Sequence, residues 1–202
     1  MTLPASHLAV DRPPLIMPDA VAAHLRVAYA AAGTILEYGM GGSTAMAAEM
    51  SGKTVFSVES DAGWIARMRA WFDTAPPAAA LHLHHGDIGP TGEWGHPARQ
   101  GTFKRWAAYP HSVWDRDDLI APDVVLIDGR FRAACFATVA FRITRPTVVL
   151  FDDYADRPAY HDVERLARPV ALIDRMARFE ISPRAMTPEH MEWFVRVHLR
   201  PL

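Results

Sequence analysis

The sequence contains 202 residues, half of them hydrophobic, so it can bury one sizeable core and is expected to form a single domain over residues 1–202. Its 21 basic and 23 acidic side chains give a net charge of -2, and no basic cluster favours nucleic acid as a partner. One cysteine excludes an intrachain disulfide framework. No segment has the pattern of a membrane span or a secretory signal, so we expect a cytoplasmic protein without a membrane partner. The oligomeric state stays unknown.

The first half of the chain alternates between strand and helix patterns. Residues 1–18 carry four prolines and are expected to form an irregular arm, followed by a helix over residues 19–32. Five apolar segments of strand length then alternate with helical patterns, as expected for a parallel sheet covered by helices. These predicted strands cover residues 34–38, 54–59, 80–84, 123–128 and 147–152. The predicted helices between them cover residues 43–50, 61–74 and 133–144.

The segment 89–121 is long for a strand connection and contains three tryptophans and one tyrosine, Trp94, Trp106, Tyr109 and Trp114. Long connections in compact domains are often functional, and aromatic faces suit sugars or planar acceptors. The alternative is that the rings pack this aromatic insertion onto the domain. We expect at least two of the four to do only that.

After residue 169 the pattern changes, and Met176–Ile181 and Glu192–Leu199 are predicted to be two strands that pair antiparallel or pack locally. The whole order of elements predicts a doubly wound α/β fold. Its sheet is expected to have seven strands, mostly parallel, with a C-terminal antiparallel hairpin and a Rossmann-like topology.

A glycine-rich turn follows the first predicted strand, in the pattern E-x-G-x-G-G-S from Glu37 to Ser43. Glycines there let the backbone turn sharply and approach a ligand closely, and strand, glycine turn and helix form the architecture of nucleotide-cofactor sites. The dinucleotide fingerprint G-x-G-x-x-G would place a third glycine where Thr44 stands. The glycines concerned are Gly39, Gly41 and Gly42.

Acidic residues close most of the predicted strands, at the sheet edge where open α/β sheets bind ligands. Glu59 lies about twenty residues after the glycine turn, where a carboxylate can accept both ribose hydroxyls of a cofactor. Single acids at such positions also cap helices, and Asp61 is expected to do so. The other strand-end acids are Asp87, Asp128, Asp152 and Asp153.

Asp128, Asp152 and Asp153 end neighbouring strands and are expected to converge as an acidic trio. Clustered carboxylates repel each other, and all-oxygen ligation suits Mg²⁺ or a similar divalent cation. Alternatively, Arg130 or Arg132 pairs with the aspartates and removes the need for a metal, or binds an anionic substrate.

These motifs resemble those of class I S-adenosylmethionine-dependent methyltransferases, in which E-x-G-x-G-G-S is motif I. The Asp-Gly turn and the Asp pair are similar to those of metal-dependent O-methyltransferases of the catechol, macrolide-sugar and glucuronoxylan types. The resemblance implies that S-adenosylmethionine is the cofactor, and that Mg²⁺ or another divalent cation is bound by Asp128, Asp152 and Asp153. The implied cofactor contacts are Glu37, Gly39, Gly41, Gly42, Ser43, Glu59, Ser60, Asp87, Ile88 and Asp128.

The expected function is therefore O-methylation of a hydroxylated small molecule or saccharide, with a metal lowering the pKa of the acceptor hydroxyl. The general base is unknown, because positions used by some relatives hold Phe131 and Arg130; Asp128 and Arg130 are the candidate catalytic residues. Two alternatives stay open. One is an NAD(P)-dependent oxidoreductase, and the other is a non-catalytic domain that binds S-adenosylmethionine or S-adenosylhomocysteine.

Overall fold

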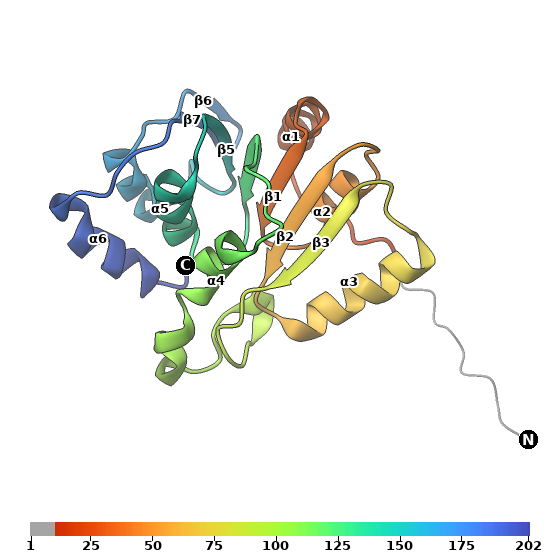
Figure 1. Cartoon of the computed structure of the whole chain (residues 1–202), viewed down its shortest axis with the longest axis horizontal. Coiled ribbons are helices and arrows are strands. Elements are labelled where there is room, and N and C mark those ends of the chain that lie inside the picture. Colours follow the sequence, from red (N-terminus) through yellow and green to blue (C-terminus); the bar gives the residue numbers. More distant parts are fainter. Residues whose placement is uncertain (1–10) are drawn as a thin grey trace, which may run out of the picture.

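A computed structural model describes residues 11–202, so the first ten residues of the predicted arm lie outside it. Seven strands form one sheet in the order β3-β2-β1-β4-β5-β7-β6 (Figure 1). The strands β1 to β5 pair in parallel, whereas β7 is antiparallel to β5 and to β6. The predicted fold class is confirmed. The strands are β1 Thr34–Tyr38, β2 Thr54–Glu59, β3 Ala80–His85, β4 Val124–Ile127, β5 Thr147–Phe151, β6 Ala171–Ile173 and β7 Met176–Ile181.

Helices cover both faces of the sheet because the central strands bury side chains on both sides. Along β4, Val125 and Ile127 pack into the cluster that includes α5 and α6, whereas Val124 and Leu126 pack into the cluster that includes α1. The helices are α1 Asp19–Ala31, α2 Gly42–Ala48, α3 Ala62–Thr74, α4 Ala108–His111, α5 Arg132–Arg142 and α6 Pro188–His198. Within residues 11–202, every helix is too short or too polar to cross a bilayer.

The predicted strand at Glu192–Leu199 is wrong, because these residues belong to helix α6 and its end. Their alternating pattern is equally compatible with a helix: Trp193 and Val197, four residues apart, are buried, while Val195 and Leu199 are about half exposed. Pro188 at the first position of α6 fits a helix start. The antiparallel hairpin exists, but β7 pairs with the short strand β6 instead.

The aromatic insertion folds as short helical turns rather than an open loop. Trp106 and Tyr109 are buried in the core, and Trp114 donates its indole N–H to the Tyr38 hydroxyl at 2.6 Å. Three of the four rings therefore pack the insertion onto the domain. Only Trp94 among them is strongly exposed, at 81%.

A pair of histidines, His198 buried and His111 half-buried, fastens α6 to the domain. His198 Nε2 lies 2.9 Å from His111 Nε2, and the Thr138 hydroxyl lies 3.3 Å from both atoms. His198 Nδ1 lies 2.6 Å from the Phe194 carbonyl, to which it can donate. Burial lowers the pKa of His198 to about 4, and His111 adds to this effect. Burial and Arg142 also lower the pKa of His111, against the opposing charge of Asp115.

We expect the fold to become less stable as the pH decreases below about 6.5, because of this pair of histidines. A histidine whose folded-state pKa lies below its usual 6.5 contributes stability that is complete above pH 6.5 and lost as the pH falls towards 4. The free energy of unfolding should therefore be about 2 kcal/mol lower at pH 5 than at pH 7 on account of His198 alone. Urea denaturation at both pH values should show a smaller difference for His198→Leu than for the wild type. Equal differences would contradict this assignment.

Candidate cofactor and acceptor site

The glycine turn after β1 touches the turn after β4. Gly39 has a φ of 107°, and a Cβ there would lie 2.7 Å from the Gly129 nitrogen. A Cβ at Gly129 would collide with the hydroxyl of the buried Tyr109. Both positions therefore need glycine, and the two turns lie directly against each other. By contrast, a Cβ at Gly41 would meet no atom within 4 Å, so the outer side of the turn is open to a ligand.

Glu37 holds the glycine turn from beneath. Its carboxylate accepts from the Tyr29 hydroxyl at 2.7 Å and from the Thr44 hydroxyl at 2.6 Å, and it is completely buried. Thr44 also accepts from the Gly41 N–H at 3.0 Å. Burial raises the pKa of Glu37, and the hydroxyl hydrogen bonds oppose that rise. Thr44, which stands where the dinucleotide fingerprint has its third glycine, thus connects Glu37 to the glycine turn.

Residues 11–18 of the predicted arm cross α2, a placement that the sequence did not indicate. Arg12 forms two hydrogen bonds with Glu49, at 2.7 and 3.2 Å. A Cβ on Gly42 would collide with the backbone of Pro14 and its neighbour Leu15. The arm therefore lies directly against the first residue of α2, and Gly42 is required by that contact rather than by a ligand.

Glu59 ends β2 and faces the glycine turn. Its Oε1 accepts from the Ser60 N–H at 2.6 Å and the Asp61 N–H at 3.0 Å, and its Oε2 accepts from the Met40 N–H at 3.4 Å. Burial raises the pKa of Glu59, while these N–H groups lower it. The Ser60 hydroxyl donates to the Gly95 carbonyl at 2.9 Å, so the start of the aromatic insertion lies beside the predicted ribose acceptor.

Asp87 and Ile88 follow β3 but differ in their surroundings. Asp87 accepts from the Gly89 N–H at 2.9 Å and pairs with Arg105, and both contacts lower its pKa. Its side chain is 46% exposed and therefore accessible to a ligand. Ile88 is completely buried in the core, so its side chain supports this edge from within.

The structure brings the acidic trio together as predicted. Oxygens of Asp128, Asp152 and Asp153 lie within 4.8 Å of one another. Burial raises the pKa of Asp128 to about 7, the neighbouring aspartates add to this rise, and Arg132 opposes it. Asp153 has a φ of 56°, in the left-handed region that costs free energy for a residue other than glycine.

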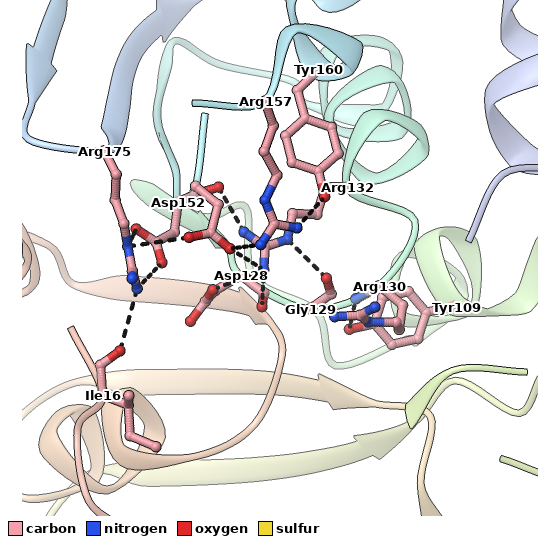
Figure 2. Close-up of polar contacts among 11 residues, drawn as sticks. Ile16, Tyr109, Asp128, Gly129, Arg130, Arg132, Asp152, Arg157, Tyr160 and Arg175 are labelled. Atoms are coloured by element: carbon pink, nitrogen blue, oxygen red, sulfur yellow. Dashed lines mark hydrogen bonds and ion pairs between the residues drawn. The ribbon is translucent and has the colours of Figure 1, made fainter. Parts of the chain in front are cut away.

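Arg132 lies between the strand ends and is only 5% exposed at its side chain (Figure 2). It donates to the carbonyls of Gly129 at 3.0 Å, Asp152 at 2.6 Å and Asp128 at 3.1 Å. Its Nη2 also lies 3.2 Å from one carboxylate oxygen each of Asp128 and Asp153. The alternative that Arg132 pairs with the aspartates is therefore confirmed.

Two further arginines that the sequence reasoning missed complete the charge balance. Arg175, in the turn between β6 and β7, donates to both oxygens of Asp152, at 3.1 and 2.7 Å, and to Asp153 at 3.2 Å. It also donates to the Ile16 carbonyl of the arm at 3.3 Å (Figure 2). Arg157 lies 2.9 Å from Asp153. Neither arginine belongs to a motif, so only the folded chain reveals them.

The donor set of the trio is right for a hard divalent cation, but its present arrangement is not. Three guanidinium groups already contact the three aspartate side chains, and both oxygens of Asp152 are bound by Arg175. A cation at this place would require Arg175 to move away and would add two positive charges to a balanced cluster. As arranged, these residues do not fit a divalent metal, and metal assistance stays a prediction.

No protein-family model and no curated protein matches the sequence. Among solved structures, a methyltransferase-like protein from Silicibacter pomeroyi DSS-3 is 46% identical with a TM-score of 0.90, over 94% of this chain and 99% of that one. A methyltransferase from Geobacter sulfurreducens shares 10% identity at a TM-score of 0.55, over 84% and 82% of the two chains. The O-methyltransferase TomG from Streptomyces achromogenes shares 15% sequence identity at a TM-score of 0.53, over 85% of this chain and 82% of that one.

The last two similarities show the fold alone, whereas the first covers nearly the whole of both chains at high identity. The chain therefore belongs to the same methyltransferase-like family as the Silicibacter pomeroyi protein and has the class I methyltransferase fold.

We expect Arg132→Lys to lower the free energy of unfolding by about 3 kcal/mol, because one ammonium group cannot replace the five directed contacts that the buried guanidinium makes to buried and partly buried oxygens. The matched control is Arg157→Lys. The Arg157 side chain is 50% exposed, and its loss should cost less than about 1 kcal/mol. Guanidinium denaturation of both variants measures the difference. Equal, small losses would show that Arg132 does not hold the strand ends together.

Proposed function

We propose that the chain binds S-adenosylmethionine across the glycine turn, in the space beside Gly41. The observation that carries this proposal is that Gly41 is open on its outer side while Glu59 and Asp128 end the strands on either side of β1. The proposed cofactor site comprises the predicted contacts Glu37, Gly39, Gly41, Gly42, Ser43, Glu59, Ser60, Asp87, Ile88 and Asp128. Of these, Glu37, Gly42 and Ile88 act by supporting the site from beneath.

The proposed reaction is methyl transfer to a hydroxyl group of a small molecule or saccharide. When bound, S-adenosylmethionine supplies a methyl group already activated by its sulfonium, so the protein has to align the acceptor and take its proton. Asp128 is the candidate base because its side chain is 29% exposed, compared with 19% for Asp153 and none for Asp152. Similarity to TomG, an O-methyltransferase solved with S-adenosylmethionine, agrees with this proposal at the level of the fold.

Cofactor binding is tested by calorimetric titration with S-adenosylhomocysteine. Gly41→Val should reduce affinity more than about tenfold by filling the ligand's space, with an unchanged Tm because no atom lies within 4 Å of the new Cβ. Glu59→Gln should weaken binding by about 1–3 kcal/mol through unpaired ribose hydroxyls. Gly101→Val, equally free of neighbours, is the control and should bind normally.

Unchanged affinity in both Gly41→Val and Glu59→Gln would place the cofactor elsewhere. Binding of NAD⁺ in place of S-adenosylhomocysteine would favour the oxidoreductase alternative. Cofactor binding without turnover on any hydroxylated acceptor would favour a non-catalytic domain.

The role of metal is decided by comparing the wild type with Arg175→Gln. With both oxygens of Asp152 bound to Arg175, millimolar Mg²⁺ should leave the Tm of the wild type unchanged, and EDTA should not affect turnover. Arg175→Gln frees Asp152, and Mg²⁺ should then raise the Tm because a ligand of the folded state stabilises it. Asp153→Ala in that background should remove the response. A Mg²⁺-dependent rise in the wild type would instead establish the predicted metal site.

A further inference from the structure

Arg130 is the one arginine beside the acidic trio that has no carboxylate partner within residues 11–202. The trio carries at most three negative charges, and fewer when Asp128, with its pKa of about 7, is protonated. Arg132, Arg157 and Arg175 supply three positive charges in direct contact with it. Arg130 therefore adds a positive charge that the cluster does not need for its own balance.

The position of Arg130 places this charge next to the proposed cofactor site. It directly follows Gly129, whose backbone lies against Gly39 of the glycine turn. The Arg130 N–H points to the Tyr109 hydroxyl at 3.4 Å, and the side chain lies beside Tyr109, apart from the other three arginines (Figure 2). A group bound by Arg130 would thus lie near the cofactor turn without competing for the trio.

The guanidinium of Arg130 has unused hydrogen-bonding capacity. Its Nε is buried with no hydrogen-bond partner, an arrangement that costs free energy. Its terminal nitrogens have no partner within residues 11–202 either, yet they are not enclosed as Nε is. An oxyanion bound end-on would accept from both accessible terminal nitrogens together, a fork geometry that lysine cannot offer.

We propose that Arg130 binds an oxyanion group of the methyl acceptor, so that the acceptor class is hydroxylated carboxylates or phosphates rather than neutral alcohols or sugars. This inference rests on the proposed function, because it names the substrate class of that same site. The carboxylate and the phosphate share the chemistry that Arg130 recognises, and the experiment separates them.

The test is a calorimetric titration of the protein with benzoate, inorganic phosphate and the neutral benzyl alcohol, each with and without S-adenosylhomocysteine. Benzoate or phosphate should bind the wild type, and benzyl alcohol should not. Arg130→Gln should weaken oxyanion binding at least about tenfold, and Arg130→Lys should restore only part of it. Arg69→Gln, which removes an exposed arginine on α3, is the control and should bind like the wild type.

The outcomes separate the inference from the proposed function. Failure of S-adenosylhomocysteine to bind the wild type removes the proposed function, whatever the oxyanions do. Normal cofactor binding combined with equal oxyanion affinity in the wild type and Arg130→Gln, or with no oxyanion binding, overturns the assignment of Arg130 alone. Preference for benzoate or for phosphate identifies which oxyanion the acceptor carries.

Discussion

The carboxyl edge of the sheet depends on one buried cation, Arg132. Its guanidinium contacts three backbone carbonyls and two carboxylates, and so connects the end of β4 to the end of β5. A buried ion pair offsets its desolvation only when its remaining hydrogen-bonding groups are satisfied, and the planar fork of arginine satisfies them here. The left-handed backbone of Phe131 and Asp153 is retained next to these contacts, which compensate its cost.

A second constraint is the contact between the turns that follow β1 and β4. Gly39, Gly129 and the buried Tyr109 hydroxyl leave no room for a side chain, so the two turns keep a fixed relation. The proposed cofactor position and the base candidate Asp128 therefore share one rigid frame. Two connections far apart in sequence complete this frame: the arm passes α2, and the start of the insertion contacts Ser60.

The charge balance of the site distinguishes two ways to keep three carboxylates together. A divalent cation leaves them available as ligands and serves the acceptor directly, whereas guanidinium groups occupy their oxygens and act mainly on the protein. In this structure the carboxylates are paired in the second way, with arginines from α5, from the turn before β7 and from the segment after β5. Arg130, which pairs with none of these carboxylates, is the proposed contact for an anionic group of the acceptor.

The sequence by itself determined the sheet, the glycine turn and the acids at the strand ends. These features are local: buried strands are continuous apolar runs, and acids that directly follow parallel strands must share one edge. The convergence of Asp128, Asp152 and Asp153 was predictable for that reason.

Tertiary structure alone decided what neutralises those acids. Arg175 reaches Asp152 because β7 pairs antiparallel with β5. A prediction that pairs β7 with a strand at Glu192–Leu199 does not contain this contact. The strand prediction was wrong because apolar residues at every second position of a short segment are compatible with two structures. They fit a strand with one buried face, and they also fit a helix that buries Trp193 and Val197, four residues apart. Glu37, too, showed its role only in the fold, because Tyr29 and Thr44 meet its carboxylate from different elements.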